Sequence, residues 1–232
     1  TCQLNMRPAL FFTILFTIFS PIYAFALCSD NGYTIVYVNG ILTKEQEADE
    51  DKDNLQRQFL RRSNVQNVVF RTGYNQSHIS GFGDTIQSIA QSFGNSISDF
   101  DRDTILMQIH PQVSTRKILL VGHSQGTFYT NSLYKYFLDN GVPRESITVY
   151  NLATPADRVE GGGAYLTSTN DKLINGIRPL MAKAGAPAPL PANITIPLPA
   201  NEASEKAGGH HFSSSYLVGA PDRIVGDISK AL

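Results

Sequence analysis

The sequence predicts an α/β fold in which a mostly parallel sheet is covered by helices on both faces. Short runs of β-branched and aromatic residues alternate along the chain with longer segments of helical period, the pattern of strand–helix–strand units. The expected strands are almost continuously apolar, as in sheets that are buried on both faces. One of them, residues 118–121, leads through a glycine-flanked turn into a helix over 127–138. We expect a single domain over residues 27–232.

The first half of this domain supplies two expected strands and three expected helices. Residues 33–38 and 68–70 are strands by composition. The helix over 43–62 between them is acidic in its first half, which suits the positive end of the helix dipole. Apolar residues at helical spacing predict another helix over 84–93, and a further helix over 104–112 leads toward the strand at 118.

The second half of the domain continues the alternation of strands and helices up to a proline-rich segment, which interrupts it. Residues 147–152 and 164–169 are the next expected strands, and a short helix is expected over 172–177. Residues 183–207 are rich in alanine and contain five prolines, which deny this segment a regular helix or a central strand. A loop that enters an apolar helix near Tyr216 follows it.

Composition excludes several classes of protein. The 232 residues are 42% hydrophobic and 10% aromatic, so the chain is not disordered as a whole. A formal net charge of −1 provides no electrostatic basis for binding nucleic acid or an anionic membrane. No feature of the sequence indicates an oligomeric state.

Residues 1–26 have the features of a signal peptide. Met6 and Arg7 form a basic start, and the apolar run 9–19 is short for a bilayer span. Ala24 and Ala26 supply small residues in the A-x-A spacing of a cleavage site, so we expect cleavage after Ala26, a true start at Met6, and a secreted or periplasmic protein without a stable membrane span. An uncleaved anchor is the alternative.

The chain has two cysteines, Cys2 and Cys28. Cleavage after Ala26 would leave Cys28 alone, so no internal disulfide is expected. A lipid anchor on Cys28 is a second possibility, although Leu27 is bulky for the residue before a lipidated cysteine.

The turn at residues 122–126, GHSQG, fits the pattern G-x-S-x-G. A sharp bend from strand to helix strains the residue at its apex, and small residues two before and two after it let the neighbouring backbones pass. Ser124 is that residue, and its hydroxyl would lie at the positive end of the following helix. We interpret Ser124 as a nucleophile; the alternative is a purely structural turn.

Three further segments accompany this turn: residues 39–41 (NGI) after the first strand, 170–174 (NDKLI), and 209–212 (GHHF). Together with the turn they resemble the α/β-hydrolase-fold esterases and lipases, in which G-x-S-x-G forms the nucleophile elbow. The resemblance covers roughly residues 33–218. It implies a Ser–acid–His order along the chain and hydrolysis of carboxylic esters without a cofactor. Asn39 stands where the family carries a histidine in its oxyanion turn.

A serine hydroxyl needs a base within hydrogen-bond reach, and that base is oriented by a carboxylate. Of the five histidines, only His210 and His211 follow Ser124. We favour His210 because it follows a glycine pair directly, and His211 remains open. His123, inside the turn, is expected to be structural.

Two aspartates follow expected strands and could orient the base. Catalytic side chains in parallel sheets lie just beyond the carboxyl ends of strands, which is where Asp157 and Asp171 occur. Asp171 follows the later strand, where this family carries its acid, and is favoured. It could also be the N-cap of the helix that begins after it.

An oxyanion produced at Ser124 would need backbone donors. The N–H of Gln125, just after the nucleophile, is the first candidate, and the turn near Gly40 is expected to supply the second.

We expect no metal and no cofactor. Asp99, Asp101 and Asp103 resemble the start of a calcium loop, but Thr104 and His110 replace the required glycine and glutamate. The histidine pair at 210–211 lacks a third ligand of suitable type nearby.

The sequence therefore predicts an exported serine hydrolase acting on a small-molecule or lipid ester through Ser124, Asp171 and His210. A thioesterase, amidase or peptidase is chemically compatible, and a non-catalytic binding protein of the same fold is the alternative of a different class. We further expect residues 183–207 to form a mobile flap beside the site, because several of their side chains are too apolar for a solvated linker. An ordered loop packed on the core is the alternative.

Overall fold

The computed structural model describes residues 32–41, 43–76, 99–109 and 117–232. The expected signal peptide, Cys28 and the helix expected over 84–93 lie outside these residues. The strands are β1 (Tyr33–Val38), β2 (Val68–Thr72), β3 (Lys117–His123), β4 (Ile147–Leu152) and β5 (Ala164–Leu166). The α-helices are α1 (Glu45–Arg62), α3 (Asp99–Ile109), α4 (Gly126–Asp139), α5 (Lys172–Lys183) and α6 (Pro221–Ala231).

The five strands form one sheet in the order β2-β1-β3-β4-β5, and every neighbouring pair is parallel. The predicted α/β class is confirmed. β3 is central, with Val121 opposite Tyr37 of β1 and Tyr150 of β4. All five strands therefore end at the same edge of the sheet, and β3 ends there directly before Ser124.

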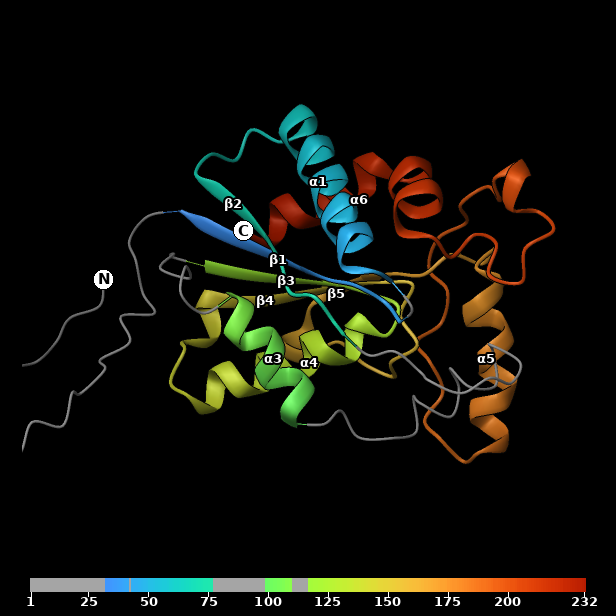
Figure 1. The fold of residues 1–232 in the computed structure, drawn as a ribbon, viewed down its shortest axis with the longest axis horizontal. Coiled ribbons are helices and arrows are strands. Elements are labelled where there is room, and N and C mark those ends of the chain that lie inside the picture. Colours follow the sequence, from blue (N-terminus) through green and yellow to red (C-terminus); the bar gives the residue numbers. More distant parts are fainter. Residues whose placement is uncertain (1–31, 42, 77–98, 110–116) are drawn as a thin grey trace, which may run out of the picture.

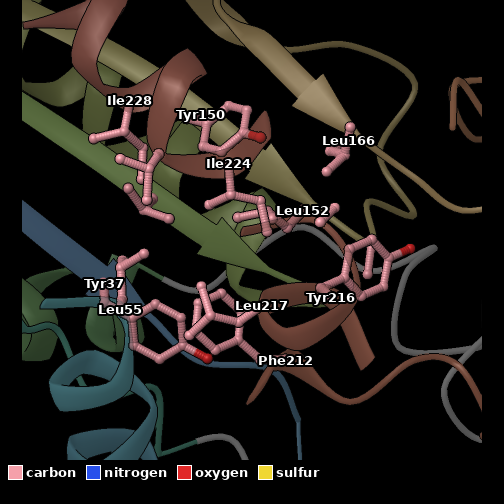
Figure 2. Packing of buried hydrophobic residues seen from close by; sticks show 14 of the residues in the cluster. Tyr37, Leu55, Tyr150, Leu152, Leu166, Phe212, Tyr216, Leu217, Ile224 and Ile228 are labelled. Carbon is pink, nitrogen blue, oxygen red and sulfur yellow. The ribbon is translucent and has the colours of Figure 1, made fainter. Parts of the chain in front are cut away.

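Helices cover both faces of the sheet: α1 and α6 lie on one face, and α3 and α4 on the other (Figure 1). Successive strand residues point to opposite faces, so Ile35 and Tyr37 join the core under α1 and α6, whereas Val36 and Val38 join the core over α3 and α4. Figure 2 shows the first of these cores, in which Leu55 of α1 and Ile224 of α6 contribute to the same cluster as strand residues. This burial on both faces explains the continuous apolar runs.

Some element bounds differ from those expected. The helix expected over 104–112 already includes Asp99 in the described span Asp99–Ile109, and residues 110–112 of that prediction lie outside the described part of the chain. The strand expected over 164–169 ends at Leu166. α5 continues through Pro179 to Lys183 because its buried face, which includes Ile177 and Met181, packs on the core and compensates for the hydrogen bond that proline lacks. Among the described helices, none combines the length and the apolar character needed to cross a membrane.

Candidate active site

Ser124 lies at the bend between β3 and α4 with φ 55°, a left-handed conformation that residues other than glycine rarely adopt. Its backbone is held on both sides. The N–H donates to the Leu152 carbonyl (3.0 Å), and the carbonyl accepts from the N–H (3.0 Å) and the hydroxyl (2.7 Å) of Thr127. The strained turn is therefore fixed by its neighbours, and it places the serine at the carboxyl edge of the sheet.

The glycines two residues before and after Ser124 have no room for a side chain. A Cβ at Gly126 would lie 2.2 Å from the Val38 carbonyl oxygen, and one at Gly122 would lie 2.8 Å from the Thr127 Cα. Backbone atoms cannot move away to relieve such contacts, whereas the end of a flexible side chain can. The G-x-S-x-G spacing thus follows from the close passage of β1, β3 and α4.

His210 bridges Ser124 and Asp171. Its Nε2 is 2.9 Å from the Ser124 Oγ, and its Nδ1 is 2.9 Å and 3.1 Å from the two Asp171 carboxylate oxygens. With Nδ1–H donating to the carboxylate, Nε2 is free to accept the proton of the serine hydroxyl. The exposed fractions of Ser124, Asp171 and His210 are 2%, 0% and 7%, so this chain of hydrogen bonds is shielded from bulk water.

Asp171 is held in place by two further donors. The Ile174 N–H donates to one oxygen (2.9 Å), so the same carboxylate also caps α5, and the Tyr216 hydroxyl donates to the other (2.9 Å). Burial, together with the charge of Asp171, holds the pKa of Tyr216 well above its ordinary value, so this hydroxyl stays protonated. Figure 2 shows Tyr216 at the edge of the apolar cluster, its hydroxyl turned away from the neighbouring side chains.

His123 contacts the backbone of the histidine loop, residues 209–215, which carries His210. Its ring is buried, and its Nε2–H donates to the His210 backbone carbonyl (2.8 Å). Burial and the nearby His210 ring hold the pKa of His123 well below its ordinary value, so the ring is neutral. The structural role expected for His123 is therefore more specific: it fixes the backbone of the residue that contacts Ser124.

The two alternatives left open by the sequence lie elsewhere. His211 is exposed and pairs with Glu205 (2.9 Å), and Asp157 is exposed and pairs with Arg158 (3.0 Å). Neither side chain is part of the hydrogen-bonded chain at Ser124. The geometry therefore brings His210 and Asp171 to Ser124.

The backbone at Gly40 lies against Ser124: a Cβ at Gly40 would be 2.8 Å from the Ser124 Cβ and 3.3 Å from its Oγ. Buried amides hold this turn. The Asn39 side chain donates to the Gly40 carbonyl (2.8 Å) and accepts from the Asn75 N–H (2.8 Å), and the Asn75 side chain donates to the Gln125 side chain (2.9 Å). Gln125 directly precedes α4, where backbone N–H groups lack partners within the helix. The network thus joins the two backbone segments expected to face an oxyanion.

A cavity of about 480 Å³ opens onto Ser124 and His210. One wall is formed by α1 and includes Glu47, Glu50 and Asp51. Burial raises the pKa of Asp51, and the charges of the two glutamates raise it further, although hydrogen bonds from Ser213 and Tyr37 act in the opposite direction. Asn54 of α1 also lines the cavity, and the other lining residues are Ile41, Thr43, His123, Leu173, Ala207, His211, Phe212, Ser213 and Ser214.

The proline-rich segment packs beside β5 and contributes little to this cavity. Thr169 and Thr167 exchange backbone hydrogen bonds with Asn193 and Ile194, and Ile196 is buried in the core. Of the described residues in 183–207, only Ala207 lines the cavity. This placement favours the ordered loop over the mobile flap, because the apolar side chains are used for packing.

Within the described part of the chain, no group of three or more His, Cys, Asp or Glu side chains is placed to hold a metal ion. No protein-family model matches the sequence, and no curated protein matches it. The chemistry open to this site is therefore inferred from its own geometry.

Proposed function

We propose that this protein is an exported serine hydrolase of the α/β-hydrolase fold that cleaves carboxylic esters through an acyl-enzyme. The observation that carries the proposal is the continuous chain of hydrogen bonds from Ser124 through His210 to Asp171, at 2.9 Å for each link. It starts at a serine whose strained backbone matches the nucleophile elbow of that fold. A structural turn would need neither the aligned histidine nor the buried carboxylate behind it.

In the first half of the reaction, the Ser124 Oγ attacks the acyl carbon while its proton passes to His210 Nε2. Asp171 stabilises the resulting imidazolium through the hydrogen bond to Nδ1. The oxygen of the tetrahedral intermediate would be stabilised by the backbone N–H of Gln125 and by that of Gly40. His210 then returns the proton to the departing alcohol, and the acyl group remains on Ser124.

In the second half, water occupies the place of the alcohol. His210 removes a proton from this water, whose oxygen attacks the acyl carbon and forms a second tetrahedral intermediate. Collapse releases the carboxylic acid and returns the proton to Ser124. A cavity of about 480 Å³ beside Ser124 suits a small-molecule ester, since ligand sites of this kind measure roughly 300–1,000 Å³.

A fluorophosphonate probe tests this proposal, because it labels an activated serine covalently. We expect one label per chain, on Ser124, and turnover of short-chain aryl esters by the unlabelled protein. Ser124→Ala should lose the label and at least about a thousandfold in turnover while staying folded.

The matched control is Ser146→Ala. Ser146 precedes β4 at the opposite edge of the sheet, so this variant should keep both the label and the turnover. A folded Ser124→Ala protein that still turns over esters would contradict the proposal.

A further inference from the structure

A buried carboxylate that has no role in the proposed reaction accepts hydrogen bonds from the histidine loop. Glu202, at the end of the short 3-10 turn Ala200–Glu202, is 2% exposed. Its Oε2 accepts from the Gly209 N–H (2.8 Å) and the Ser215 hydroxyl (2.6 Å), and its Oε1 accepts from the Ser214 hydroxyl (2.6 Å). Glu202 is not one of the described residues that line the cavity, so it would not contact a substrate there.

The three donors lie on both sides of His210 along the chain. Gly209 comes directly before it and has φ 77°, a left-handed conformation that glycine adopts without steric cost. Ser214 and Ser215 belong to the π-helical segment Phe212–Leu217 that follows. The next residue, Tyr216, donates to Asp171 (2.9 Å). One carboxylate therefore connects the chain before His210 with the segment that also holds the acid.

A carboxylate suits this position because it only accepts hydrogen bonds, and three donors converge on it. Burying a charge is costly unless it is hydrogen-bonded. Burial would raise the pKa of Glu202, but the hydrogen bonds from Ser214, Ser215 and Gly209 outweigh it and hold the pKa below its ordinary value. Glu202 is therefore ionised at neutral pH. A charge buried at this place indicates that Glu202 acts on the backbone and side chains that donate to it.

We propose that Glu202 is a positioning residue: it fixes the loop from Gly209 to Ser215 so that the His210 imidazole stays aligned between Asp171 and Ser124. The alignment itself is independent of the reaction. Only the consequence for turnover rests on the proposed function. The two claims can therefore fail separately.

The test compares Glu202→Ala and Glu202→Gln with the control Glu205→Gln. Glu205 belongs to the same segment but is exposed and contacts His211 rather than His210. Glutamine keeps one acceptor oxygen for Gly209, so Glu202→Gln should be milder than Glu202→Ala. The activity-independent measurement is the proton NMR signal of the His210 Nδ1–H, which lies far downfield when it is hydrogen-bonded to a carboxylate.

We expect this signal in the unmodified protein and in Glu205→Gln, a weakened signal in Glu202→Gln, and a broadened or absent one in Glu202→Ala. With an aryl ester, kcat of Glu202→Ala should fall by about 10–100-fold, as for a small misplacement of a reacting group. KM should change by less than about threefold, because the cavity lining is intact.

A folded Glu202→Gln or Glu202→Ala protein that keeps both the signal and kcat overturns the proposal, even if its Tm is lower, because Glu202 would then only stabilise the fold. If Glu202→Ala does not fold, Glu202→Gln decides. If the unmodified protein turns over no ester, the proposed function fails, while the NMR signal in the variants still decides the role of Glu202.

Discussion

Removal of the Tyr216 hydroxyl should destabilise the protein far more than it slows the reaction. The hydroxyl donates to the Asp171 carboxylate (2.9 Å) and accepts from the Ser168 N–H (2.8 Å). Tyr216→Phe deletes one oxygen atom and leaves the ring in the core, so no sizeable cavity forms. Two buried polar groups, the Asp171 oxygen and the Ser168 N–H, each lose a partner.

A hydrogen bond to a charged group contributes about 1.5–3 kcal/mol, and a buried donor without a partner costs about 1–3 kcal/mol. Since relaxation recovers part of this sum, we expect the free energy of unfolding to fall by about 3 kcal/mol. In a domain of this size that corresponds to a Tm lower by about 6–12 °C. Asp171 keeps its hydrogen bonds to Ile174 and His210, so kcat should fall by less than about tenfold.

Urea unfolding followed by circular dichroism measures the first effect, and steady-state hydrolysis of an aryl ester measures the second. The control is Tyr165→Phe, which removes a hydroxyl from a half-buried tyrosine of β5 and should change the free energy of unfolding by less than about 0.5 kcal/mol. A loss below about 1 kcal/mol in Tyr216→Phe, with an unchanged denaturant slope, would refute the account of how Asp171 is held.

Three further predictions concern the neighbours of Ser124. Gly40→Ala should lower kcat/KM at least about tenfold, because the new methyl group would lie 2.8 Å from the Ser124 Cβ; kinetics on purified, folded protein check this. His210→Ala should abolish ester turnover, whereas His211→Ala, which alters an exposed side chain, should retain most of it; the reverse result would move the base by one residue. The pKa of His123 is depressed, so the unfolded chain binds a proton below about pH 6.5 that the folded chain does not. The free energy of unfolding should therefore fall as the pH drops from 7 to 5.5, and less so in His123→Gln, as urea titrations at both values would show.

The parallel sheet and the hydrogen-bonded residues Ser124, His210 and Asp171 could be expected from the sequence because their signals are local. β3 and α4 are recognisable from apolar runs and periodicity, and the G-x-S-x-G spacing marks the turn between them, although the crowding at Gly126 comes from the distant Val38 of β1. Asp171 and His210 each lie in a short segment with its own pattern, an aspartate just beyond an expected strand and a histidine after two glycines.

The supporting contacts could not be expected, because they join residues far apart in the chain. His123 meets the backbone of a residue 87 positions later, and Tyr216 meets Asp171 across 45 positions. Glu202 follows no strand and gave no signal beyond being a carboxylate eight residues before His210. The apolar residues of the proline-rich segment suggested a flap, since composition alone does not distinguish side chains that cover a cavity from side chains that pack on a core.

The most direct measurement is the identification of the acyl-enzyme. The protein is mixed with an aryl ester, quenched within the first turnover, digested and analysed by mass spectrometry. The account predicts a burst of one phenol per chain and one acyl group on the peptide that contains Ser124. Ester hydrolysis without any acyl group on Ser124, or with the acyl group on another residue, would contradict it.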